Sequence, residues 1–122
     1  MMYPDVFALM LADPTVTSKL GSAPLKFYPG GMAPQGVNAP YAVWQVFSGY
    51  PENYINQKPD IDSISIQIDV YSSTLQEARE ITTAIVDVVE SNAHVTNWRG
   101  EQQEKETLLY RVSFDSDWFV NR

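Results

Sequence analysis

The sequence predicts an α+β domain in which a mostly antiparallel sheet packs against one long helix and a short N-terminal helix, in the order α-β-β-β-α-β-β. Apolar and polar residues alternate over residues 62–71, which is typical of a strand with one buried face. Apolar residues recur at helical spacing over residues 75–92. Strand-like segments lie on both sides of that helix in the sequence, so one sheet recruits strands from before and after it.

The N-terminal segment predicts a short helix over residues 5–12, because its apolar residues fall on one stripe. Pro4 suits the first helical position, where its missing N–H would have no partner in any case. Residues 15–20 predict a second short turn, which Gly21 closes. The stripe of the first helix consists of Val6, Leu9 and Met10.

Residues 25–28 predict a short strand, and residues 29–40 an irregular surface loop, because three Gly and three Pro interrupt any regular pattern. Residues 41–48 predict a strand that is apolar on both faces and is therefore internal to the sheet and covered on both sides. Residues 49–59 form a second loop, too long for a two-residue hairpin turn. The two faces of the strand carry Ala42, Trp44 and Val46, and Tyr41, Val43 and Phe47, with Gln45 the polar exception.

The second half of the chain gives the strongest patterns. The helix over residues 75–92 begins with a capping box in one of two registers, Ser73 with Gln76 or Thr74 with Glu77. Its buried stripe consists of Ala78, Ile81, Ile85, Val88 and Val89. Two strands follow, over residues 95–101 and 107–117, joined by a polar turn. The expected inward residues of the last strand are Leu108, Tyr110, Val112 and Phe114.

Aromatic residues close to the end of the chain need a packing partner, because chain ends otherwise fray. Trp118 and Phe119 are followed by Val120. They dock either on the domain's own sheet or on a neighbouring molecule.

Length and composition indicate a single domain over residues 1–122, large enough to fold around its own core. The absence of cysteine excludes a disulfide framework, a Cys-ligated zinc site and a thiol nucleophile. We expect neither a secretory signal nor a membrane span, since the start lacks a basic region and no apolar run is long enough. The net charge of −7 disfavours tight binding to duplex DNA.

No combination of residues indicates catalysis, a metal site or a bound cofactor, so we expect a protein that is not an enzyme. The single histidine, His94, follows the long helix, where a capping or solvated role is expected. Two acidic pairs could chelate a hard cation, but their spacing is not that of a calcium loop. These pairs are Asp60 with Asp62, and Asp115 with Asp117.

In its order of short motifs, from Val6 to Phe119, the chain resembles the tail-completion, or tail-terminator, proteins of long-tailed bacteriophages. The motifs are Leu11-Ala12-Asp13, Val16, Gly21, Tyr28-Pro29, Ala33-Pro34-Gln35-Gly36, Ala39-Pro40-Tyr41-Ala42-Val43-Trp44-Gln45, Ser48-Gly49, Ile66-Gln67-Ile68-Asp69-Val70-Tyr71-Ser72 and Glu77-Ala78-Arg79.

The resemblance implies a structural virion protein that forms a homohexameric ring at the head-proximal end of the tail tube. Such a ring ends tube polymerisation and supplies the head–tail joining surface. Its implied partners are further copies of the chain, the tail-tube protein and a head-side connector or neck protein. DNA passes through without being held tightly, no membrane is involved, and assembly takes place in the cytoplasm of the bacterial host. An acidic ring lumen would repel the DNA phosphates.

Two alternatives remain open: a head-side neck adaptor of the same fold, and a small ligand-binding or hydrolytic α+β domain. For the ring we expect contacts from both long loops, although loops of this kind are also compatible with a merely flexible surface. The expected subunit or partner contacts are Met32, Gln35, Val37, Tyr50, Tyr54 and Ile55.

Overall fold

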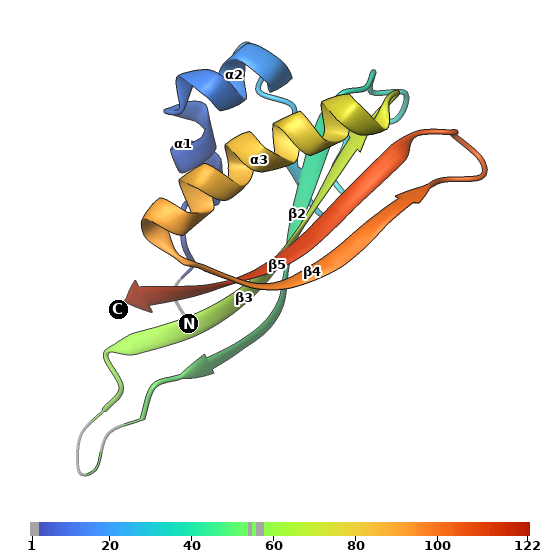
Figure 1. The fold of residues 1–122 in the computed structure, drawn as a ribbon. Coiled ribbons are helices and arrows are strands. Elements are labelled where there is room, and N and C mark those ends of the chain that lie inside the picture. Colours follow the sequence, from blue (N-terminus) through green and yellow to red (C-terminus); the bar gives the residue numbers. More distant parts are fainter. Residues whose placement is uncertain (1–2, 54, 56–57) are drawn as a thin grey trace.

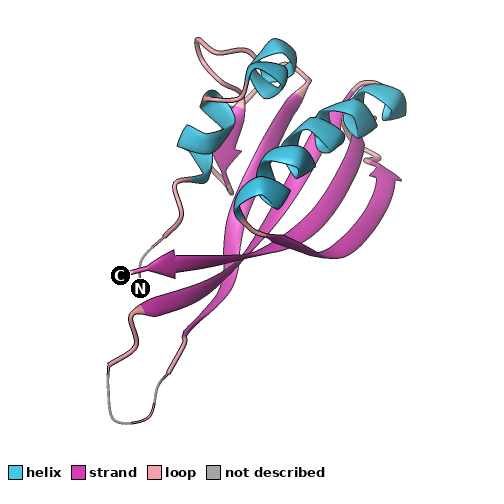
Figure 2. Cartoon of the chain, turned by 60° about the vertical axis from the view of Figure 1, so that its left-hand side comes forward, coloured by secondary structure: helices cyan, strands magenta, loops and turns pink. Residues whose placement is uncertain are grey.

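The computed structural model describes residues 3–53, 55 and 58–122. Three helices lie on one face of a five-stranded sheet, which confirms the predicted α+β class (Figures 1 and 2). The predicted second turn is a full helix. The elements are α1 (Val6–Leu11), α2 (Pro14–Leu20), β1 (Phe27–Pro29), β2 (Tyr41–Pro51), β3 (Ile61–Ser72), α3 (Leu75–Asn92), β4 (His94–Gln103) and β5 (Tyr110–Asn121).

The strand order across the sheet is β1-β2-β3-β5-β4, and every neighbouring pair is antiparallel except β1 with β2. β3 is the central strand and pairs with β5 over its whole length, from Ile61 opposite Asn121 to Ser72 opposite Tyr110. The far half of the β2–β3 hairpin extends beyond the helices, at the lower left of Figure 1. We call this part of the sheet, residues 48–53 and 58–65 together with Ile55, the arm.

The core lies between α3 and the two middle strands, β3 and β5. The alternation predicted for residues 62–71 is confirmed: one face of β3 is fully buried beneath α3, and Ile81 and Ile85 of the helix meet it. α1 and α2 cover the neighbouring end of the sheet around Phe27. The buried residues of β3 are Ile64, Ile66, Ile68 and Val70.

Side-chain caps fix where the helices begin. Thr74 caps α3 by accepting a 3.2 Å hydrogen bond from the Glu77 N–H, so the second of the two predicted capping registers is the correct one. Asp5 caps α1 in the same way, through the N–H of Ala8. Pro4 therefore precedes the cap, and our prediction that it occupies the first helical position was wrong.

The prediction that residues 41–48 are covered on both faces was wrong. Ala42 is buried, and Trp44 and Val46 pack against the core, but Gln45 and Phe47 on the other face are exposed. All three helices lie on one side of the sheet, so nothing of the described chain stacks on the opposite face (Figure 2). The apolar pattern of β2 therefore reflects an open face that carries apolar residues.

The last strand begins later and ends later than predicted. Leu108, expected in the core, lies in the β4–β5 turn with a φ of 61° and is 63% exposed. Tyr110 opens the strand, and Val112 and Phe114 are buried as expected. The strand continues through Trp118, which is buried against the domain's own core, whereas its neighbour Phe119 is exposed.

We expect Phe114→Ala to lower the free energy of unfolding by about 3–5 kcal/mol, because its ring is fully buried and its removal leaves a cavity. Phe119→Ala on the same strand is the matched control, and its effect should stay below about 1 kcal/mol. Urea unfolding followed by circular dichroism measures both. Equal losses would show that Phe119 also belongs to the core.

Candidate functional site

The sheet face opposite the helices, which we call the open face, carries mostly polar side chains in aligned rows across the strands. One row runs from Gln45 through Gln67 to Asp115, and the next from Val43 through Asp69 to Ser113. Asp69 and Asp115 are less than 9% exposed although no helix covers them. Burial of this kind requires hydrogen-bond partners, and the open face supplies them.

Arg99 organises the middle of the open face. It projects from β4 and binds the Asp115 carboxylate at 2.7 Å, while its guanidinium lies 5.6 Å from the centre of the Phe47 ring on β2. Arg99 and Phe47 belong to strands that β5 and β3 separate, so the two side chains reach toward each other over those strands. The hydrogen bond to Asp115 is the main cause that raises the pKa of Arg99.

Asp69 is satisfied by neutral donors. The Ser113 hydroxyl and the Gln67 amide both donate to its carboxylate. Asn97 lies 3.4 Å from Asp115 and adds a second donor there. The open face is therefore a connected polar network whose carboxylates already have partners within the chain.

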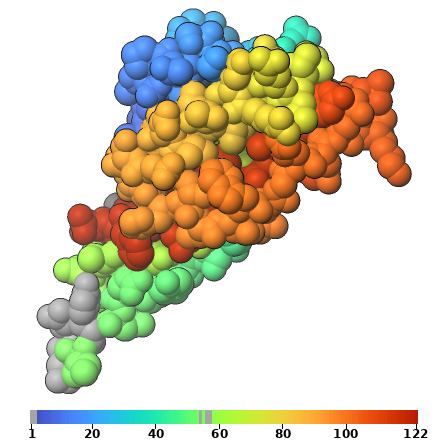
Figure 3. Space-filling model, in the orientation of Figure 1, coloured from blue at the N-terminus to red at the C-terminus, as the bar shows by residue number. Residues whose placement is uncertain are grey.

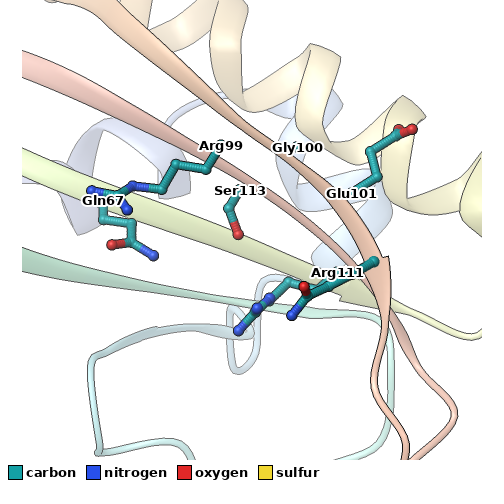
Figure 4. Close-up of a pocket in the computed structure, with 7 residues that line it drawn as sticks. Gln67, Arg99, Gly100, Glu101, Arg111 and Ser113 are labelled. Carbon is teal, nitrogen blue, oxygen red and sulfur yellow. The ribbon is translucent and has the colours of Figure 1, made fainter.

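A hollow of about 220 Å³ lies beside this network and is shown in Figure 4. Arg99 and Arg111 both line the hollow, whereas the side chain of Glu101 points away from them. Glu101 instead forms a two-pronged ion pair with Arg79 of α3, at 2.6 and 2.7 Å, and this hydrogen bonding lowers the pKa of Glu101. The other lining residues are Gln67, Gly100, Gln102 and Ser113.

The charged side chains that line the hollow are paired within the chain. Arg99 is engaged by Asp115, and Arg111 lies 3.4 Å from Glu104, so both cations have acidic partners. No histidine lines the hollow. Among residues 3–53, 55 and 58–122, no group of three or more acidic or histidine side chains is arranged to hold a metal ion. The chemistry that this surface offers is recognition by polar and aromatic side chains.

One aspartate of each acidic pair in the sequence forms an ion pair with an arginine. Asp62 is buried and accepts hydrogen bonds from Arg122 at 2.9 Å, and Asp115 is bound by Arg99. Asp117 accepts a hydrogen bond from Ser65 at 2.6 Å. His94 is exposed at the start of β4, and its ring contacts that of Phe119 edge-on.

The two loops expected to make contacts lie at opposite ends of the molecule (Figure 1). Residues 30–40 lie near the start of α3, where Met32 and Gln35 are exposed and Val37 is half-buried. Tyr50 and Ile55 belong to the arm at the other end, and both are exposed, Ile55 at 91%. Tyr54 lies outside the described residues. The structure thus separates the predicted contact residues into two surfaces.

Exposed aromatic residues mark the arm itself. Tyr50 of β2, Ser63 of β3 and Phe119 of β5 form one row across three strands, and both rings are exposed. The arm and the β4–β5 turn project from opposite ends of the body (Figure 3). Phe47 and Phe119 were not among the expected contact residues. Phe47 was expected on a covered face of its strand, and Phe119 was expected to dock either on the domain's own sheet or on a neighbouring molecule.

Arg99 was also missed as an organising residue. It is the extra residue at the second register shift of β4, between Trp98 and Gly100, and β-bulges of this kind have no reliable sequence pattern. The polar side of the alternating residues 62–71 was the one available signal, since it placed Gln67 and Asp69 on a common face.

Taken together, the fold and its surfaces define a small α+β protein with contact surfaces that project from opposite ends. No helix within the described residues has the length and apolarity needed to span a bilayer. Comparison with protein families agrees with this class. Residues 4–121 match the family model described as "Tail completion protein gp17", so the chain belongs to this family of phage tail structural proteins, which are components of the virion.

The fold recurs in a solved structure. A chain in the structure titled "Virion of native gene transfer agent (GTA) particle" matches with a TM-score of 0.69 over 96% of this chain and 92% of that chain, at 12% identity. At that identity the match supports the shared fold alone. Among curated proteins, none matches the chain by sequence.

The stacked pair Tyr41 and Tyr71, with ring centres 4.9 Å apart, predicts a loss of stability at alkaline pH. Burial raises the pKa of both phenols above 10, so the folded state holds these protons more tightly than the unfolded state. Their contribution is fully present below pH 10 and is lost as the pH rises through the folded-state values.

The double variant Tyr41→Phe/Tyr71→Phe keeps both rings and removes the titration. We expect its free energy of unfolding to fall less between pH 9 and pH 11 than that of the parent, as measured by urea unfolding. Parallel pH profiles for the two proteins would contradict this prediction.

Proposed function

We propose that copies of this chain form a ring, a homohexamer, that closes the head-proximal end of the phage tail tube. The ring ends tube polymerisation and provides the surface to which a head-side connector or neck protein binds. The observation that carries the proposal is the family match over residues 4–121. Assembly takes place in the cytoplasm of the bacterial host, and the ring stays in the virion.

The positions of the contact surfaces support a protein that joins two different partners. Met32, Gln35 and Val37 lie at one end of the domain, and Tyr50 and Ile55 belong to the arm at the other. One end therefore serves the tail-tube protein and the other the head side, while neighbouring copies meet along the edges of the sheet. A connection between unlike partners needs two distinct surfaces on each subunit.

The charge of the chain suits a passage for DNA. The net charge is −7, because Asp and Glu outnumber Lys and Arg by 15 to 8. A lumen lined by such groups repels phosphate, so DNA passes without adhering. A neutral or basic lumen in the assembled ring would refute this part of the proposal.

Tube length tests the main proposal directly. Tail-tube protein should polymerise to long tubes alone, and adding this chain should stop growth and leave a ring at one tube end in electron micrographs. Native mass spectrometry of the isolated caps should give six copies. Unchanged tube lengths together with a chain that stays monomeric in the presence of tubes would refute the proposal.

The arm is expected to be needed for assembly and not for folding. Tyr54→Ser/Ile55→Ser should weaken ring formation on tube ends and leave the melting temperature nearly unchanged, because Ile55 is 91% exposed. Leu108→Ser is the matched control, since it removes an exposed apolar side chain from another loop. A large drop in melting temperature for the double variant would show that the arm residues belong to the core.

A further inference from the structure

The sheet ends in two different unpaired edges. β1 covers only the first part of β2, from Ala42 to Trp44, so residues 45–51 have no strand on their outer side within the described chain. β4 is the other end of the sheet, and none of the described residues forms a strand along its outer side over its ten residues. Unpaired edges of this length are ready-made sites for strand addition.

The ladder shows which backbone groups of β2 point outward. The N–H of Ala42 donates to Lys26 at 2.9 Å and the Trp44 carbonyl accepts from Gly30 at 2.6 Å, so these two residues face away from β3. Alternation places Val46 outward as well, and the bulge after it moves the outward positions to Gly49 and Pro51. Pro51 has no N–H, so this edge offers three carbonyls and only two donors.

The same alternation on β4 gives the complementary edge. Four residues of β4 pair with β5 residues whose backbone N–H and carbonyl groups point toward β4. These four residues are His94, Asn97, Gly100 and Gln102. The outward positions are therefore Val95, Trp98, Glu101 and Gln103, and each carries an N–H. β4 thus supplies the donors that the β2 edge lacks, whereas two β2 edges would face each other with too few donors.

Strand direction also fits. Three successive antiparallel pairings, β2 with β3, β3 with β5 and β5 with β4, make β2 and β4 run in opposite directions. A second copy rotated about an axis along the strands keeps these directions, so its β4 meets β2 antiparallel. The two edges differ, so a row of subunits joined in this way always has one free β2 edge and one free β4 edge at its ends. Only closure into a ring pairs these last two edges.

Exposed apolar side chains flank both edges. Trp98 of β4 is 62% exposed, and Phe47 and Tyr50 of β2 are about half exposed. Large rings on edge strands become covered when a neighbouring strand adds beside them. We infer that the free edge of β2, residues 45–51, pairs antiparallel with β4 of a second copy of this chain; the inference rests on the proposed ring and identifies the contact between its subunits.

The first experiment changes the β2 edge. Gly49→Pro removes an outward donor and no ladder bond within the chain, and Gly49→Ala is the matched control that keeps the N–H. Ring formation on tube ends, measured by native mass spectrometry and electron microscopy, should fall at least tenfold for Gly49→Pro and stay near the parent level for Gly49→Ala. Equal assembly by the two variants would overturn the inference but would not contradict the proposed ring.

The second experiment does not depend on the proline variant folding. The chain has no cysteine, so Ser48→Cys on β2 and Thr96→Cys on β4 introduce the only thiols. Within one chain these positions lie three strand spacings apart, about 14 Å, too far for a disulfide. A short bifunctional thiol reagent applied to assembled rings should link the double variant into a ladder of trimers and larger species.

The single variants separate the other outcomes. Each should stay monomeric on denaturing gels, because β2 meets β4 and not its own copy. Dimers from Ser48→Cys alone would show a twofold β2 contact and overturn the inference. Rings without a ladder from the double variant would overturn it and leave the proposed function standing, whereas failure of the parent chain to assemble on tubes would overturn both.

Discussion

The structure depends on the packing of α3 across β3 and β5. One face of β3 carries Ile64, Ile66, Ile68 and Val70, and the isoleucines of α3 pack in the same core, so a single helix covers the two middle strands. The same arrangement leaves the other face of the sheet without a helix. Every surface feature that bears on assembly, including the polar network and the free edges, follows from this one-sided covering.

The open face is held in place by side chains and not by a second layer. Arg99 connects Asp115 on β5 with the Phe47 ring on β2, and Ser113 and Gln67 satisfy Asp69. Buried carboxylates with complete sets of partners fix the strands relative to one another, because any slip would leave a charge without its donors. A sheet fixed in this way can present its edges to neighbours at a constant angle.

The sequence predicted the elements with strong periodicity and failed where the tertiary context decides. Residues 75–92 and the core face of residues 62–71 are as expected, since amphipathic spacing determines them directly. The apolar pattern of β2 did not reveal that one face is open, because an exposed Phe47 and a buried one look alike in sequence. The separation of the two contact loops to opposite ends depends on strand order, and strand order leaves no local pattern. Leu108 was misplaced because its positive φ is a property of the turn.

Hydrogen bonds hold residues 30–40 to neighbouring parts of the chain near both ends of the segment. The Gly30 N–H binds the Trp44 carbonyl, and a side chain on Gly30 would lie 3.0 Å from Gln45, while Lys26 holds the Asn38 carbonyl. By contrast, no atom lies within 4 Å of where a side chain on Gly31 or Gly36 would begin. The segment between these anchors can therefore change length without disturbing the sheet, although the φ of 78° at Gly31 and at Gly36 favours glycine at both positions. Changes to this segment can therefore test the binding of a partner separately from the folding of the domain.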